Sequence, residues 1–374
     1  MSTSPPAPGR DRSAGRTRPE PAARARRAVA LLLAAVVALV AGCGVRLETP
    51  PPALPSPGLD EQVRARGVAD AQRLQDLASR LLAAGAQDDG LAATLEDVAV
   101  FSARHAEELG GVWDPGVATP TPTPTAGPGP TTPPGVVDLL EALVAGTEHA
   151  LADADAAGDG RLARLVAAVG ASRADLCRRL AAAASLPVPD VAAVPEPGVG
   201  TDLAPAREPG DGDEGDDDAS GTPEPSPSAT AAGLLEGELD PLVLAHDQAG
   251  YGYEVLAARW TGAARQRAAA AATRHRALAQ AWAQVAGVEG TPDDPRRVAY
   301  ALPVLDTTKQ KRALARDLES AVADATSVLV AEASPGTRAV LLDGLRRATA
   351  DAQTWGAAPV AFPGMPELAQ DPTG

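Results

Sequence analysis

The chain has few aromatic residues and very little lysine. Aromatic side chains make up 2% of its 374 residues, lysine occurs only as Lys309 and Lys311, and the two cysteines are Cys43 and Cys177. Long alternations of β-branched residues, which are typical of strands, are also missing. Alanine, leucine, valine, glutamate and arginine are abundant instead, and this composition suits helices. We therefore expect an all-α fold accompanied by disordered segments.

No motif of a known catalytic or cofactor site stands out. Glycine-rich phosphate loops, cysteine pairs at zinc-binding spacing and a serine–histidine–aspartate order in motif context are all missing. No helix carries a long basic face, and the formal net charge is −16. Such an acidic chain repels nucleic acid. We therefore expect a non-catalytic protein without a nucleic-acid partner.

The first 42 residues have the organisation of a bacterial lipoprotein signal peptide. A basic region with five arginines, Arg16 to Arg27, precedes the apolar run Ala28 to Val40. This run is too short to cross a bilayer as a stop-transfer helix. It leads into Leu39-Val40-Ala41-Gly42-Cys43, which resembles a lipobox. We expect lipidation of Cys43 and anchoring at the extracytoplasmic face of the plasma membrane.

Cleavage before Cys43 would make the protein more acidic and leave one unmodified thiol. Residues 1–42 hold seven arginines against Asp11 and Glu20, a balance of +5, so the remainder carries about −21. Once Cys43 is acylated, Cys177 has no partner for an internal disulfide. We interpret Cys177 as a small, partly buried helix residue.

The mature chain divides into two helix-forming regions and several segments of low complexity. In chain order these are a proline-rich spacer at 43–58, a first helical region at 59–185 with a Thr/Pro loop at 118–135, an acidic linker at 186–232, a second helical region at 233–366, and a tail at 367–374. We expect the linker to be disordered, because its proline, glycine and acidic residues cannot bury a core.

Each helical region contains four helical segments, with a long proline-containing connection between the second and the third. The expected segments are 59–84, 90–110, 136–156 and 160–184 in the first region, and 233–260, 262–286, 307–333 and 336–356 in the second. This loop pattern is typical of a four-helix bundle with one long crossover. The third and fourth segments of the two regions also align at an offset of 176 residues, and the second segments at an offset of 170, with the loop between them absorbing the difference. This alignment indicates an internal duplication.

The second region resembles a ferritin-like domain of unknown function that occurs in exported actinobacterial proteins. The matching elements are His246-Asp247-Gln248-Ala249-Gly250-Tyr251-Gly252-Tyr253, Arg274-His275-Arg276, Tyr300-Ala301-Leu302-Pro303, Trp355 and Phe362-Pro363-Gly364-Met365-Pro366. The resemblance implies an up-down-down-up bundle over residues 233–366, and it implies no reaction. This chain departs from the family at Ala245, where the family commonly has glutamate before the histidine.

Two histidines of the second region are candidates for a metal site. The Glu-x-x-His signature of di-iron bundles is missing, because no histidine has a glutamate three residues earlier. His246 and His275 nevertheless lie on the apolar stripes of adjacent helices, with Asp324 and Asp351 near the same level. Two interpretations stay open: a site for iron or another divalent cation, or neutral core histidines that bind no cofactor. We favour the second.

These observations leave two functional hypotheses. The first is a cell-envelope protein, anchored in the membrane through Cys43, whose helical bundles form a non-catalytic binding or scaffolding module. The alternative is a metal-binding ferritin-like protein or an oxidoreductase, with His246, His275, Asp324 and Asp351 as its ligands. The two differ in whether these four side chains converge within ligand distance of one another.

The lipid anchor leads to the first prediction. Substituting Cys43→Ala should release the protein from the membrane or leave an uncleaved precursor, because the thiol that carries the acyl chains is lost. Membrane fractionation and intact-mass measurement of both forms check this. Unchanged retention and processing of the variant would contradict the assignment.

Overall fold

A computed structural model describes residues 57–85, 88–111, 135–191, 234 and 236–369, and its regular structure there is entirely helical. The elements are α2 (Leu59–Ala83), α3 (Asp89–Glu108), α4 (Val136–Ala156), α5 (Gly160–Ala183), η1 (Glu236–Glu238), α6 (Asp240–Arg259), α7 (Gly262–Val285), α8 (Thr308–Glu332), α9 (Ala339–Thr354) and η2 (Pro366–Leu368). The all-α fold predicted from composition and periodicity is therefore confirmed.

Two helices of the second region begin later than the apolar pattern indicated. The pattern placed the start of α6 at residue 233, but α6 begins at Asp240 with a proline in its first turn. Proline is tolerated there because the first amide groups of a helix have no internal acceptor. The start of α9 was expected at residue 336, but Gly336 has a φ of 79° and α9 begins at Ala339. A left-handed residue cannot continue a right-handed helix.

Short polar side chains fix the starts of three other helices. The carboxylates of Asp88 and Asp159 accept hydrogen bonds from the amides of Leu91 and Leu162, at 2.9 and 3.0 Å. Thr307 forms a reciprocal capping box with the third residue of α8. Each cap satisfies backbone donors that the helix leaves unpaired.

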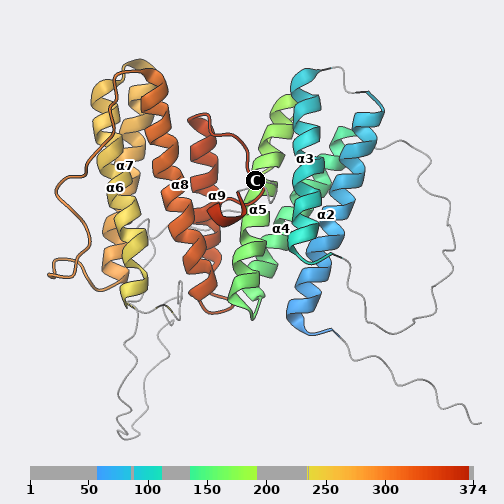
Figure 1. Ribbon diagram of the computed structural model, residues 1–374, viewed down its shortest axis with the longest axis horizontal. Coiled ribbons are helices and arrows are strands. Elements are labelled where there is room, and N and C mark those ends of the chain that lie inside the picture. The colour runs from blue at the N-terminus through green and yellow to red at the C-terminus, as the bar shows by residue number, and fades with distance from the viewer. Residues whose placement is uncertain (1–56, 86–87, 112–134, 192–233, 235, 370–374) are drawn as a thin grey trace, which may run out of the picture. The chain divides into compact units, whose positions relative to one another are not determined.

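The helices form two groups of four, α2–α5 and α6–α9 (Figure 1). In each group the first and fourth helices run one way and the second and third run the other way. In the second group, the long connection at 286–307 returns along the bundle, so that α7 and α8 run in the same direction. The up-down-down-up order expected for the second region is therefore the order that the chain follows.

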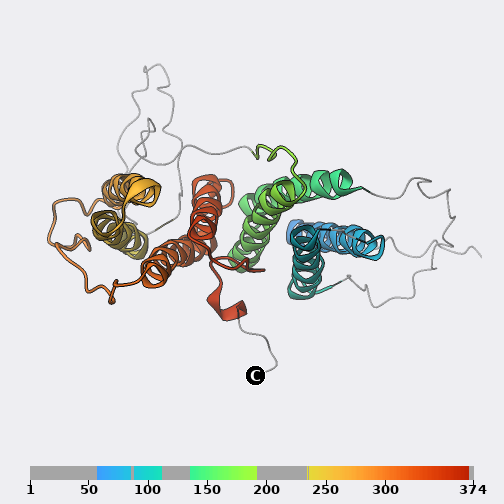
Figure 2. The same cartoon turned by 90° about the horizontal axis from the view of Figure 1, so that it is seen from above.

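The two groups pack against each other through α5, α8 and α9 (Figure 2). One cluster of buried apolar residues includes side chains from both groups, among them Ala163, Val166 and Leu341. The C-terminal end of α4 also meets the turn that follows α8: the amide of Gly336 donates to the carbonyl of Asp155 at 2.7 Å. Described residues of both groups thus belong to the compact unit Pro57–Gly374.

Glycine and arginine make this close approach feasible. A Cβ atom at Gly160 would collide with the backbone carbonyl of Ala331, the residue that precedes the α8 terminus by one. Arg338 is 1% exposed and donates hydrogen bonds to carbonyls at the end of α4 and to Ala333, at 2.7 to 3.2 Å. Its guanidinium therefore satisfies acceptors that the helix end cannot pair internally.

The C-terminal segment, residues 357–369, lies across helices of the first group. The backbone carbonyls of Val360 and Leu368 accept hydrogen bonds from Ser172 of α5 and Arg104 of α3, at 3.1 and 2.6 Å. The ring of Phe362 contacts His105 edge-on, with centroids 5.2 Å apart. The end of the second region is therefore held by the first region.

Several predicted features lie outside the described residues. These are the signal peptide at 1–42, nearly all of the spacer at 43–58, most of the Thr/Pro loop at 118–135, most of the linker at 186–232, and residues 370–374 of the tail. Among the described helices, none combines the length and the apolar character needed to cross a membrane.

The contact between the two groups can be tested at one backbone position. Substituting Gly160→Ala should lower the free energy of unfolding by about 1–3 kcal/mol, the usual cost of overpacking a close contact. Gly237→Ala is the control, because a Cβ atom there meets nothing within 4 Å. Urea denaturation of the full chain measures both variants, and equal stabilities would contradict the packing described here.

Candidate functional site

Six polar side chains meet inside the α6–α9 group, and we call this set the polar centre. Its members are His246 and Tyr253 of α6, Arg274 and His275 of α7, Glu319 of α8 and Asp351 of α9. Four of the six are almost fully buried, with exposed fractions between 0% and 6%. These four side chains are buried because each lies among apolar residues spaced three or four apart on its helix.

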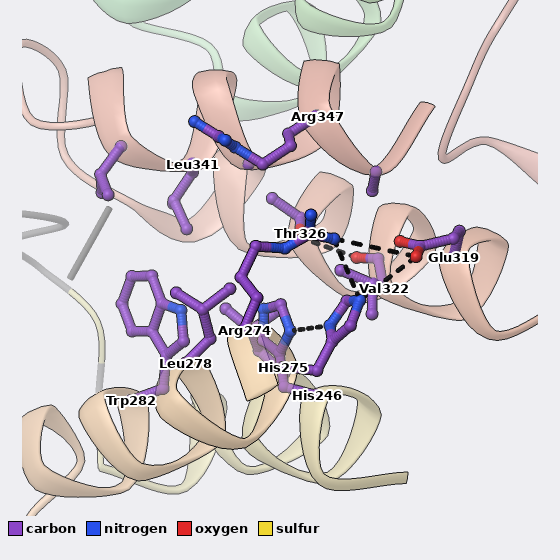
Figure 3. Close-up of a pocket in the computed structure, with 14 residues that line it drawn as sticks. His246, Arg274, His275, Leu278, Trp282, Glu319, Val322, Thr326, Leu341 and Arg347 are labelled. Carbon is purple, nitrogen blue, oxygen red and sulfur yellow. Dashed lines mark hydrogen bonds and ion pairs between the residues drawn. The ribbon is translucent and has the colours of Figure 1, made fainter. Parts of the chain in front are cut away.

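The two histidines contact each other directly. The Nδ1 atoms of His246 and His275 are 2.9 Å apart (Figure 3), so a single proton lies between them and one ring donates to the other. Burial lowers the pKa of His246 well below its usual value and lowers that of His275 to about 3. Nearby Arg274 lowers both further, since its charge disfavours a second cation. Both rings are therefore neutral near pH 7.

Glu319 links the histidine pair to Tyr253. Its Oε1 atom accepts a hydrogen bond from the Tyr253 hydroxyl at 2.7 Å and lies 3.2 Å from Nε2 of His275. Its Oε2 atom is buried and has no hydrogen-bond partner among the described residues. Burial raises the pKa of this carboxyl from 4.5 to about 7, although the hydroxyl of Tyr253 and the charge of Arg274 oppose the shift.

Arg274 supplies the positive charge of the polar centre. Its Nη2 atom donates to Asp351 at 2.6 Å and to Nε2 of His275 at 3.2 Å, and it lies 3.9 Å from Oε1 of Glu319. A guanidinium can serve several acceptors at once because its donors are fixed in one plane. The carboxylates that could have held a divalent cation are therefore paired with a cation that belongs to the chain.

The four candidate metal ligands do not all come together. His246 and His275 are in contact, and Asp351 reaches them only through Arg274. Asp324 lies elsewhere, on a face of α8 near Arg164 and Glu367. Among the described residues, no group of three or more histidine, cysteine, aspartate or glutamate side chains is arranged to hold a metal ion.

Sequence reasoning missed Glu319 as a member of the polar centre. The Glu-x-x-His signature of di-iron bundles places the glutamate three residues before a histidine on the same helix, whereas Glu319 reaches His275 from another helix. A usable signal was present: Glu319 is a carboxylate on the apolar stripe formed by Ala315, Leu318 and Val322. A charged residue on such a stripe is rare in helices unless it is paired.

The positions of the first region that the sequence alignment pairs with the candidate ligands are Asp70, His105, Glu148 and Asp175, and they form no comparable cluster. The ring of His105 faces the carbonyl oxygen of Ala361 at 2.7 Å, and its Nδ1 atom has no described partner. Asp70 contacts His149 and Asp175 contacts Arg178, at 3.0 and 2.8 Å. The first region therefore uses its interior histidine to hold the C-terminal segment.

A small cavity adjoins the polar centre (Figure 3). Its volume is about 30 Å³, enough for one or two water molecules. His246, Arg274 and Glu319 line one part of it, and apolar side chains such as Leu278 and Trp282 line another. This cavity thus has room for water beside Glu319, but not for an organic cofactor.

Cys177 offers no reactive thiol. It is 2% exposed and unpaired, and burial raises its pKa to about 12. A thiol with such a pKa is protonated at neutral pH and is a poor nucleophile. This agrees with its interpretation as a helix core residue.

Residues 242–367 match the family model described as Domain of unknown function (DUF4439). The match covers α6 to α9 and part of the C-terminal segment, and it therefore includes the whole polar centre. No curated protein and no solved structure matches the chain.

The titration of Glu319 gives a prediction with a definite sign. Because its pKa is higher in the folded state than in the unfolded state, its contribution is greatest below pH 4.5 and is lost as the pH rises through about 7. The groups that face it are Tyr253, Arg274, His275 and Asp351. Glu319→Gln removes the titration but keeps the shape of the side chain.

Between pH 5 and pH 8, the free energy of unfolding of the native chain should therefore fall by about 1–3 kcal/mol relative to Glu319→Gln. Urea denaturation at several pH values measures the difference in free energy of unfolding between the native chain and Glu319→Gln. The titrations of other groups cancel in this difference because both proteins share them. Asp317→Asn, at an exposed position of the same helix, is the control. Parallel stability curves for native and Glu319→Gln proteins would contradict the description of this carboxyl.

Proposed function

We propose that this protein is a lipid-anchored cell-envelope protein whose helical regions act as a non-catalytic binding or scaffolding module. The lipobox-like sequence ending at Cys43 supports the anchor and the extracytoplasmic location. The strong negative charge of the remaining chain suits a soluble body held near a membrane surface without adsorbing to it. The up-down-down-up order with a long crossover supports a ferritin-like origin for the second region.

The pairing of Arg274 with Asp351 and His275 is the observation that supports a non-catalytic role. In ferritin-like di-iron proteins, inward carboxylates and histidines are held by metal ions. Here a guanidinium at 2.6 Å from Asp351 and 3.2 Å from His275 provides the compensating charge. A centre whose charge is compensated by its own side chains needs no bound cation.

The packing of the two regions supports a scaffolding role. Arg338, Gly160 and the C-terminal segment hold α2–α5 against α6–α9 through specific contacts and not through apolar burial alone. These contacts join the two groups into one rigid helical body. Such a body can present surfaces to partners in the envelope at a fixed spacing.

A metal-binding function is the second candidate, and the histidine pair favours it. Two imidazole nitrogens at 2.9 Å, with Glu319 close to one ring, resemble part of a ligand set for a divalent cation. For a metal to bind, Arg274 would have to leave the polar centre. Its side chain is 28% exposed, so a path to solvent exists.

Elemental analysis and thermal unfolding distinguish the two candidates. We expect purified protein to contain no stoichiometric metal, and added iron, manganese or zinc to leave its melting temperature nearly unchanged. A metal ligated by the centre would instead stabilise the fold by about 2.7 kcal/mol at a hundred times its dissociation constant.

The double variant His246→Ala/His275→Ala tests the origin of any stabilisation. A shift that disappears in this variant but persists in His149→Ala would establish the metal-binding candidate. His149 is the matched control because its side chain is 50% exposed and lies in the first region.

A further inference from the structure

Basic side chains gather at one end of the α6–α9 group, although the chain as a whole is acidic. The segments 259–267 and 306–317 meet there, because α6 ends at this level and α7 and α8 begin at it (Figure 1). The ammonium of Lys311 donates to the backbone carbonyl of Arg259 at 2.9 Å, which joins the two segments directly. We call the seven cations of these segments the basic end: Arg259, Arg265, Arg267, Lys309, Lys311, Arg312 and Arg316.

The charge of the basic end is left uncompensated by the helices around it. The two segments contain only two carboxylates, Asp306 and Asp317. None of the seven cations forms an ion pair with a described residue, and five of them are exposed. Arginines elsewhere, such as Arg80, Arg164 and Arg276, are paired with carboxylates at 2.5 to 2.9 Å. The basic end is therefore a surface that attracts an acidic partner.

The chain itself contains an acidic run of matching charge. Residues 211–218 hold six carboxylates, with no basic, aromatic or aliphatic side chain among them. This run belongs to the linker at 186–232 and lies outside the described residues. Charges of opposite sign and similar magnitude make the acidic run and the basic end complementary.

The first attachment point of the linker lies close to the basic end. The indole rings of Trp260 and Trp355 stack with centroids 4.8 Å apart, so α9 ends at the level of the basic end. The carbonyl of Val191 accepts a hydrogen bond from Arg346 of α9 at 3.5 Å. Arg346 precedes the end of α9 by about two turns, or about 12 Å. The roughly 20 residues from Val191 to Asp211 can span more than 60 Å, so they cover this distance easily.

The second attachment point also permits the contact. The linker leads into α6, whose first residue, Asp240, lies at the opposite end of the group from the basic end. The helix has 20 residues and is therefore about 30 Å long. The roughly 20 residues between Asp218 and Asp240 can extend over twice that length. The acidic run can thus reach the basic end from both of its attachments.

A partner in the same chain also has an advantage over other anionic partners. A tethered segment is present at an effective concentration of order millimolar, whatever the concentration of the protein. A second copy of the chain, or an anionic phospholipid surface, must displace it. The acidic run is therefore the occupant that the charges and the connectivity favour.

We propose that the basic end is an intramolecular docking surface for residues 211–218, which cover its cations and shield them from other anionic surfaces. The contact is electrostatic, because the run offers carboxylates and no apolar side chain. It depends neither on the lipid anchor nor on the binding role proposed above.

Carbodiimide cross-linking tests this contact, because Lys309 and Lys311 are the only lysines of the chain. The reagent joins an amine to a carboxylate only where the two are in contact. With the full chain purified in detergent at about 0.01 M ionic strength, mass spectrometry should find amide bonds from these lysines to carboxylates of residues 211–218. The cross-links should be lost at about 1 M salt, where the Debye length falls to about 3 Å.

A mixture of the native chain with its nitrogen-15-labelled form identifies the occupant. Cross-links within one molecule support the proposal. Cross-links between labelled and unlabelled molecules would identify a second copy as the occupant and overturn it. Cross-links confined to nearby carboxylates such as Asp306 and Asp317, with none to residues 211–218, would overturn it as well.

A charge-reversed variant tests the surface itself. Arg312→Glu/Arg316→Glu keeps both lysines and should slow cross-linking to the acidic run by about tenfold. Arg73→Glu/Arg161→Glu is the matched control, because it makes the same change of charge at exposed positions of the first region and should leave the rate unchanged. Circular dichroism confirms that both variants are folded. An undiminished rate in folded Arg312→Glu/Arg316→Glu would exclude the basic end as the docking surface.

Discussion

The pairing of Arg274 with the buried groups around it is the interaction on which the second region depends. An apolar four-helix interior disfavours charge, yet α6–α9 enclose Glu319 and two histidines and place Asp351 at their edge. Removing one partner of such a network leaves an uncompensated group, at a cost of about 3–5 kcal/mol for a buried ion pair. The guanidinium is therefore the element that makes an ionisable interior compatible with a stable bundle.

Buried arginine has a related role in the remainder of the fold. Arg173 is 1% exposed and donates to the carbonyls of Gly146 and Gly67, which belong to α4 and α2. Burial lowers its pKa to about 10, so it stays charged at neutral pH. Arg338 likewise donates to backbone carbonyls, and it does so between the two regions. In a chain with little lysine and few aromatic residues, these planar donors join helices that alanine side chains alone would hold weakly.

The C-terminal segment connects the second region to the first region. It forms one wall of a cavity of about 210 Å³, and it is held by Arg104 and by the ring of His105. His105 and His275 each lie in the second helix of their group, but one holds a backbone carbonyl and the other contacts a second histidine. The two interior histidines thus have different partners, because their surroundings supply different acceptors.

The sequence by itself determined the helical class, the two sets of four helices and the inward orientation of His246 and His275. These features follow from the spacing of apolar residues and from helix-ending signals, which act over a few residues of chain. The starts of α6 and α9 were misplaced, because alanine-rich flanks extend the apolar pattern beyond Pro241 and Gly336.

Only the tertiary structure decided which groups meet. Glu319 lies beside His275, and Arg274 occupies the place where the sequence suggested a metal ion. Asp324 lines a different cavity. Periodicity gives the face of a helix on which a residue lies, but not the rotation and axial shift of the helix that it faces. Contacts between distant segments depend on those two quantities, which are set by packing of the whole interior.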